Sequence, residues 1–347
     1  RSTVWSKKNH EKIFAFAEGY KDFISVAKTE RLANDELLRL AKEKGFKSFD
    51  ELKKDGLVPG AKLYHENKGK SLVLMVLGED LEDGMKIVGS HIDVPRLDLK
   101  QVPLYEDGKM AFLKTHYYGG VKKYQWTCIP LALHGVAFTK DGQRVDLSIG
   151  EDEDDPVFYI NDLLIHLSQD QMQKKLAEGI TGEQLNVVVG HIPLEDQEKD
   201  AIKAGVLHYL NEKYNLIEED FLVSEIEVVP AGKARDVGFD RSLVAGHGHD
   251  DRVCAYSSLA AIFDVEEPKQ TAVCLFVDKE EIGSVGNSSM EALFFENLVA
   301  EILAAQGKDP VMGLRRSFAA SKVLSADVSA CFDPNFPEVS EKLNSAF

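Results

Sequence analysis

The sequence has a shortage of basic residues. Lys and Arg total 41 against 58 Asp and Glu, which gives a formal net charge of -17. Binding to nucleic acid or to an anionic membrane requires basic patches, so this balance argues against both partners. No apolar run reaches the roughly 18 residues of a membrane span. The N-terminal region is charged rather than a short apolar stretch, so we expect no signal peptide.

Cysteine is also scarce. The four cysteines are scattered through apolar runs and form no C-x-x-C pair: Cys128, Cys254, Cys274 and Cys331. This pattern argues against a disulfide framework and favours buried, reduced thiols. Together with the missing signal peptide, it predicts a cytoplasmic location.

The remaining composition is that of an ordinary globular protein, with 44% hydrophobic and 29% charged residues. A chain of 347 residues is longer than one hydrophobic core usually serves, so we expect two domains. Helical spacing of apolar residues predicts a helix around residues 13–27, and Asn34 is a candidate N-cap for a second helix. Further strands are predicted at residues 71–77, 85–90, 242–245, 271–277 and 323–326, with a capping box at 288–291 opening a late helix.

The pattern of predicted elements changes between residues 101 and 235. Short strand-like pieces alternate with turns there, at residues 114–118, 131–138, 145–149 and 221–229, with one helix carrying Ile202, Val206 and Leu210. We therefore predict an α/β domain with a mixed sheet formed by residues 1–100 and 236–347. A mostly β domain, residues 101–235, is inserted between its two halves.

Glu280 and Glu281 are the most informative residues of the chain. They follow the apolar run Thr271–Val277, which reads as a buried strand, and they precede a glycine-rich turn. Adjacent carboxylates at a desolvated strand end are costly unless a cation is present or one of them keeps its proton. A metal ion would let one glutamate act as a ligand and the other as a base. Two solvated glutamates in a loop are the alternative.

Three other predicted strands also end in polar residues: His91 with Asp93, Asp250 with Asp251, and Asp327. Ligands of open α/β sheets bind at the carboxyl ends of strands. Asp93 has the spacing to receive the second ring N–H of a metal-bound His91. A surface His–Asp pair and helix N-caps at Asp250 and Asp251 are the alternatives. His247 and His249 are rival ligands.

These motifs together resemble the aspartyl aminopeptidase family of dinuclear metallo-aminopeptidases, which is related to the glutamyl and deblocking aminopeptidases. The resemblance rests on Ser90–Asp93, Gly248–Arg252, Asp278–Ser284 and Ser325–Asp327 in that order, and it spans nearly the whole chain. It also includes Tyr118-Gly119-Gly120 with Trp126, and Leu164–Leu167.

The resemblance implies a role for each matching residue. His91, Asp250, Glu281 and Asp327 would hold two divalent metal ions, with Asp250 as the bridge and Asp93 behind His91. Glu280 would be the general base acting on a water held between the two metals. His166 would reach a neighbouring subunit's substrate, with a buried core histidine as the alternative. The expected metal is Zn²⁺, and a carboxylate-rich site also accepts Mn²⁺ or Co²⁺.

The implied function is removal of the N-terminal residue of peptides, in a homo-oligomer that is a dodecamer built from dimers through the inserted domain. The family's last ligand is a histidine near the C-terminus, whereas no histidine follows His249 here, so we expect the natural chain to be longer. Ala330 and Asp333 stand where the family has histidines, so the preferred N-terminal residue, acidic or otherwise, stays open. An inactive scaffold of the same fold and a di-metal hydrolase of N-acyl amino acids are the alternative functions.

Overall fold

The computed structural model describes Trp5 and residues 9–346. The chain forms two compact units. The first unit combines Arg1–Asp93 with Gly248–Phe347, and the second is the middle segment Val94–His247. Residues 94–100 and 236–247 therefore belong to the middle unit.

A six-stranded mixed sheet forms the centre of the first unit, in the order β1-β2-β3-β13-β4-β14. Strand β13 runs antiparallel to β3 and parallel to β4, and β14 is parallel to β4. The carboxyl ends of β13, β4 and β14 therefore meet at one edge of the sheet. The strands are β1 (Lys47–Ser48), β2 (Lys62–Asn67), β3 (Ser71–Val76), β4 (Met85–His91), β13 (Thr271–Val277) and β14 (Lys322–Ser325).

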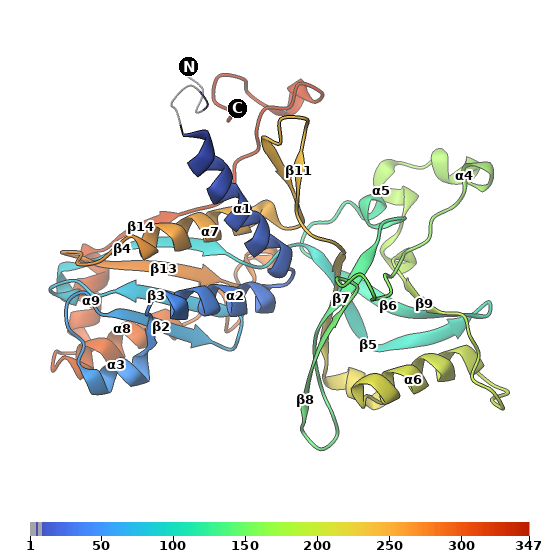
Figure 1. The fold of residues 1–347 in the computed structure, drawn as a ribbon, viewed down its shortest axis with the longest axis horizontal. Helices are drawn as coiled ribbons and strands as arrows, with labels where there is room; N and C mark the ends of the chain where they lie inside the picture. The colour runs from blue at the N-terminus through green and yellow to red at the C-terminus, as the bar shows by residue number, and fades with distance from the viewer. Residues whose placement is uncertain (1–4, 6–8, 347) are drawn as a thin grey trace. The chain divides into compact units, whose positions relative to one another are not determined.

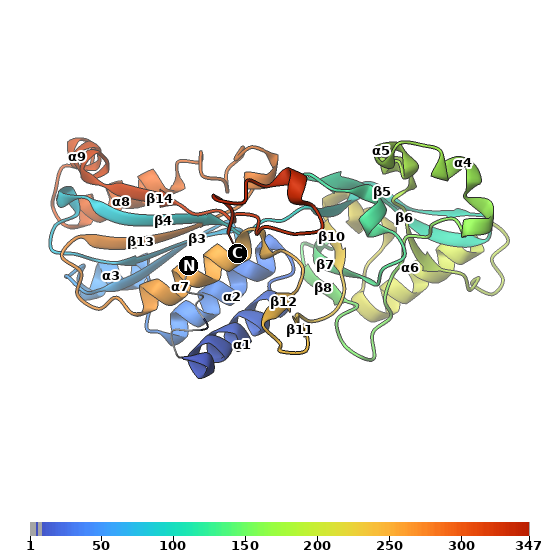
Figure 2. The same cartoon turned by 90° about the horizontal axis from the view of Figure 1, so that it is seen from above.

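Helices cover both faces of this sheet (Figure 1). One face packs against α3 (Phe49–Asp55), α8 (Phe294–Ala305) and α9 (Met312–Ala320). The other face carries α2 (Glu30–Glu43) and α7 (His249–Phe263), with α1 (His10–Val26) packed on both of these helices. Figure 2 shows α1, α2 and α7 together on their side of the sheet.

Successive side chains of β13 point to opposite faces of the sheet, which explains why helices pack on both faces. Val273, Leu275 and Val277 join the core beneath α8, while Cys274 faces α7 and donates to the Ser258 carbonyl at 3.4 Å. Because both faces are covered, the strand is apolar throughout and could be recognised from the sequence.

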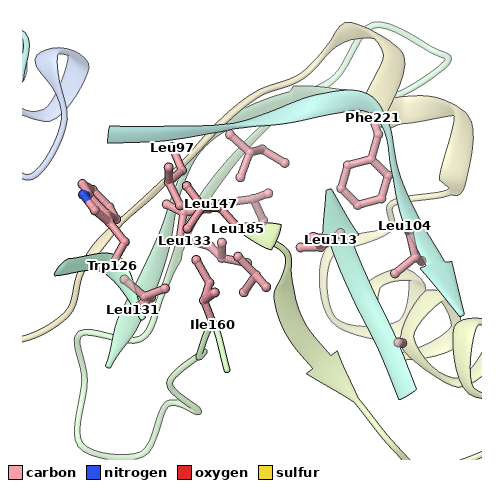
Figure 3. Packing of buried hydrophobic residues seen from close by; sticks show 14 of the residues in the cluster. Leu97, Leu104, Leu113, Trp126, Leu131, Leu133, Leu147, Ile160, Leu185 and Phe221 are labelled. Carbon is pink, nitrogen blue, oxygen red and sulfur yellow. The ribbon is translucent and has the colours of Figure 1, made fainter. Parts of the chain in front are cut away.

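The middle unit is built on an antiparallel sheet in the order β8-β7-β10-β5-β6-β9. Its strands are β5 (Arg96–Asp107), β6 (Met110–Tyr118), β7 (Leu131–Phe138), β8 (Arg144–Ile149), β9 (Val187–Gly190) and β10 (Glu225–Pro230). Helix α6 (Ala201–Tyr214) packs against the sheet over a core that includes Leu113, Leu133 and Phe221 (Figure 3). The remaining elements are α4 (Gln169–Met172), α5 (Leu176–Gly179) and the hairpin of β11 (Arg235–Val237) and β12 (Leu243–Ala245).

Three local predictions are wrong. Helix α2 is capped by Thr29, whose side chain accepts the N–H of Leu32, and Asn34 lies buried inside the helix. Ser288 opens no helix, because α8 begins at Phe294 and the Ser288 hydroxyl donates to Asp278 instead. The cysteines are all unpaired, but Cys128 and Cys331 are exposed rather than buried. Within the described part of the chain, no helix is long and apolar enough to cross a membrane.

Candidate metal centre

His91 ends β4 and is buried, with 3% of its side chain exposed. Its Nδ1 lies 2.9 Å from the backbone carbonyl of Asp93. A carbonyl can only accept, so Nδ1 carries the proton in this contact and Nε2 is left as the ligand nitrogen. Nε2 lies 3.2 Å from Oδ1 of Asp250 and 3.8 Å from Oε2 of Glu280.

Asp93 connects His91 to the glutamate pair. Its Oδ1 lies 3.3 Å from Nδ1 of His91 and accepts the backbone N–H of Glu280 at 3.1 Å, while Oδ2 accepts the backbone N–H of Glu281 at 3.2 Å. The Asp93 side chain is fully buried. One carboxylate therefore fixes the end of β4 to the start of the turn after β13.

The glutamate pair lies in a single 3-10 turn, Glu280–Ile282, immediately after β13 and Asp278-Lys279. Lys279 and Gly283 both adopt the left-handed conformation, and the N–H of Gly283 donates to the Glu280 carbonyl at 2.8 Å. This tight turn exposes 47% of the Glu280 side chain and leaves Glu281 half-buried. The two adjacent carboxylates thus have different environments, as a ligand and a base would require.

Asp250 and Asp251 stand at the start of α7 with non-helical dihedral angles. The Asp250 side chain is 55% exposed, whereas Asp251 is fully buried and its Oδ2 accepts the backbone N–H of His91 at 3.3 Å. Asp327 lies two residues past the end of β14 and is exposed.

Burial, and after it the neighbouring charges, raises the pKa values of these carboxylates. Burial, followed by the charge of Asp327, raises the pKa of Asp250, and burial raises that of Asp251 to about 6. Burial, with nearby Asp250 and Asp93, raises the pKa of Glu281 to about 7 against the opposing effect of His91. Burial alone would lower the pKa of His91, but Asp93 raises it to about 9. The carboxylates are therefore in an environment where a bound cation would be stabilising.

Two groups of side chains have the geometry of metal sites among the described residues. His91, Asp250 and Glu281 form one group, and His91, Asp251 and Asp327 form the other, with ligand atoms within 4.8 Å of one another in each. Imidazole nitrogen and carboxylate oxygen are the ligands that zinc prefers beside thiolate. The donor set and the crowded charges therefore fit divalent metal.

Comparison with known proteins agrees with this geometry. Residues 23–347 match the family described as aminopeptidase I zinc metalloprotease (M18). The chain belongs to this family. The "Probable M18 family aminopeptidase 1" of Clostridium acetobutylicum is 49% identical over 99% of the chain and 76% of its own length. The protein of the same name from Thermotoga maritima is 44% identical over 99% of the chain and 75% of its own length.

Solved structures show the same similarity. The M18 family aminopeptidase of Thermotoga maritima superposes with a TM-score of 0.96 at 43% identity, covering all of this chain and 76% of that one. The aminopeptidase I of Clostridium acetobutylicum superposes with a TM-score of 0.91 at 46% identity, with the same coverage. The predicted family, α/β fold and metallo-aminopeptidase activity are confirmed, as are divalent metal ions as cofactors. The scaffold and acyl amino acid alternatives are not favoured.

The structure brings six of the seven predicted site residues together: His91, Asp93, Asp250, Glu280, Glu281 and Asp327. His166 belongs to the middle unit and is exposed, so the core-histidine alternative is wrong. The rival ligands take other contacts. His247 packs edge-on against Trp126, and Nδ1 of His249 lies 2.8 Å from the Tyr20 hydroxyl.

The sequence places Asp251 beside Asp250 at a strand end and Arg252 in the same motif, but it assigns neither residue a role in the metal centre. The structure puts Asp251, and not Asp250, in the group with Asp327. An N-cap role suffices to explain a second aspartate at a helix start, so the sequence alone gives Asp251 no special signal. Its burial is the distinguishing property, and burial depends on the packing of α7 against β4.

Proposed function

We propose that the protein removes the N-terminal residue of peptides at a centre where His91, Asp250, Glu281 and Asp327 hold two divalent ions. Asp250 would be the shared ligand in this proposal, since its carboxylate lies within 4.8 Å of the ligand atoms of His91 and Glu281, and the charge of Asp327, after burial, raises its pKa. Bound ions would supply Lewis acidity, which lowers the pKa of a water molecule and stabilises negative charge on the substrate carbonyl oxygen.

Glu280 is the proposed general base. Its carboxylate lies 3.8 Å from the ligand nitrogen of His91 and is half-exposed, so both water and substrate can reach it. It takes the proton of the attacking water and passes it to the leaving amine. The Asp93 carboxylate holds the backbone N–H of Glu280 and thereby fixes where the base points.

The relatives of the chain favour a substrate with a free amino terminus. Asp250, Glu281 and Asp327 are ligands in this proposal, so two bound divalent ions would offset their negative charge, and charge alone does not select the substrate. The family and the similar proteins are named aminopeptidases, which act at a free amino terminus. We therefore expect aminoacyl amides to be hydrolysed in preference to N-acyl amino acids.

The substitution Glu280→Gln tests the proposed base. The amide keeps the size of the side chain but cannot accept the proton, so kcat should fall by about 10²–10⁴-fold while metal content stays unchanged. Glu291→Gln, a change at an exposed glutamate after the same turn, is the matched control and should keep full activity. Near-normal turnover by the Glu280 variant would show that Glu280 is not the general base.

We also propose a homo-oligomer, assembled as a dodecamer from dimers, in which the middle unit supplies the dimer contact. The segment around His166 supports this. Leu163, Leu164, Ile165 and Leu167 are 53–69% exposed, and contiguous exposed apolar residues mark interaction sites. In this assembly, His166 reaches the neighbouring subunit's substrate. A Saccharomyces cerevisiae relative of the same fold, 21% identical with a TM-score of 0.75, has been solved as a dodecamer.

The cytoplasm is the proposed location. The four cysteines form no disulfide although two of them are exposed, as expected in a reducing compartment. Fractionation of the source cells with an antibody against the protein would test this.

A further inference from the structure

Arg252 is the largest fully buried side chain described, although it carries a permanent positive charge. It follows Asp250 and Asp251 directly at the start of α7. Burying a guanidinium costs several kcal/mol unless strong contacts offset the loss of water. What the side chain contacts is therefore informative.

The guanidinium donates twice to one acceptor. Its Nε and Nη2 lie 3.3 and 3.2 Å from the backbone carbonyl of Ile92. The N–H of the same residue donates to the Val277 carbonyl at the end of β13, at 2.8 Å. The backbone of Ile92 is therefore held by β13 through its N–H and by α7 through its carbonyl. Ile92 lies between His91 and Asp93, so these two bonds also restrain the backbone of both neighbours.

The peptide group on the other side of His91 is held from the same helix. The Asp251 carboxylate accepts the N–H of His91, so two successive residues of α7 bind two successive residues of the β4 exit. The directions of the flanking side chains depend on this backbone. His91 points Nε2 at Asp250, and Asp93 aims its oxygens at the backbone N–H groups of Glu280 and Glu281.

We propose that Arg252 is a positioning residue for the metal centre, which sets the orientation of His91 and Asp93 through the Ile92 carbonyl. This inference rests on the ligand assignment of the proposed function. Its physical basis is that two N–H groups of the planar, rigid guanidinium converge on one carbonyl oxygen and fix its position, whereas the ammonium of a lysine is a point charge on a flexible chain.

The test compares Arg252→Lys and Arg252→Met in the intact protein with the same changes at Arg96. Arg96 is also buried, but it lies in the middle unit, where it pairs with Asp98 at 2.9 Å and Glu227 at 3.2 Å. Four quantities are measured for each variant: the dissociation constant for Zn²⁺, the visible spectrum with Co²⁺, kcat and KM, and the melting temperature of the metal-free protein.

Loss of a residue that orients metal ligands typically costs 10–100-fold in metal affinity. We expect about that loss for Arg252→Met, a smaller loss for Arg252→Lys, an altered Co²⁺ spectrum, and a fall in kcat with KM little changed. The Arg96 variants should lower the melting temperature but keep the wild-type affinity and spectrum.

Two outcomes overturn the inference. In the first, both Arg252 variants bind Zn²⁺ and Co²⁺ as the wild type does and lose only melting temperature. In the second, both fail to fold at temperatures where the Arg96 variants remain folded, which would make Arg252 a residue of the fold as a whole. If the wild-type protein itself binds no metal, the proposed function fails instead, so the two failures are distinguishable.

Discussion

At the scale of single residues, the site is governed by how differently neighbouring carboxylates are buried. Asp278 and Asp251 are buried, Glu281 is half-buried, and Asp250 and Glu280 reach solvent. Sequence reasoning found the carboxylates because they follow predicted strands. It could not rank them by burial, since burial is produced by contacts between segments far apart in the chain.

Asp278 gives a prediction for the pH dependence of stability. Burial, with the negative charge of Glu30 nearby, raises its pKa, and the Ser288 hydroxyl and Lys70 only partly oppose this. The folded protein therefore holds this proton at pH values where the unfolded chain has released it. The associated stability is present below the ordinary aspartate pKa and is lost as pH rises through the raised value.

Asp278→Asn should remove this pH dependence. The amide oxygen still accepts the Ser288 hydroxyl, and the buried charge is gone, so we expect the metal-free variant to be more stable at neutral pH by about 1–3 kcal/mol. Urea unfolding at a series of pH values measures this. Asp154→Asn, at an exposed aspartate, is the control. An unchanged pH slope in the Asp278 variant would show that folding does not shift the pKa of Asp278.

At the scale of elements, several strands were predictable and the helix starts were not. Strand β13 has the predicted bounds, because a buried strand in a layered α/β unit is apolar along nearly its whole length. Strands β4 and β14 differ from their predicted bounds by about one residue, although β14 is exposed and β4 contains the exposed Lys86. Asn34 and Ser288 show why a residue type that favours N-caps does not by itself locate the start of a helix. Each side chain has a tertiary partner, Glu66 for Asn34 and Asp278 for Ser288, which no local pattern reveals.

Helix α1 contacts the start of α7 through the hydroxyl of Tyr20. Tyr20 is buried, and its hydroxyl lies 2.8 Å from Nδ1 of His249, the first residue of α7. Tyr20→Phe should lower the free energy of unfolding by about 1 kcal/mol, because it leaves the imidazole without this partner. Urea denaturation measures the change, with Tyr64→Phe as the matched control, since the Tyr64 ring packs beneath Lys42. Equal losses in the two variants would mean that the Tyr20 hydroxyl contributes nothing specific.

At the scale of the whole molecule, the chain divides into two compact units. The six site residues of the first unit come from segments more than 150 residues apart, because the middle unit interrupts the sequence between Asp93 and Gly248. The motifs and the change in the pattern of predicted elements were visible in the sequence. The dimerising role of the middle unit and the place of His166 in an assembly stay predictions.

A pair of substitutions separates assembly from catalysis. Ile165→Asp puts a charge on the exposed apolar segment and should dissociate the oligomer, because a buried unpaired carboxylate is costly at an interface. His166→Gln should leave the oligomer intact and lower kcat. Light scattering coupled to size-exclusion chromatography, with activity measured on the same fractions, records both effects. An Ile165 variant that remains fully assembled would exclude this segment from the subunit contact.

The metal content of the intact protein, measured beside that of Asp250→Asn, tests the central claim most directly. We expect about two divalent ions per wild-type chain and loss of both from the variant, because Asp250 is the proposed ligand of both ions. A wild-type protein holding one ion or none would contradict the dinuclear centre. A variant that keeps one ion at full occupancy would contradict the bridging role of Asp250.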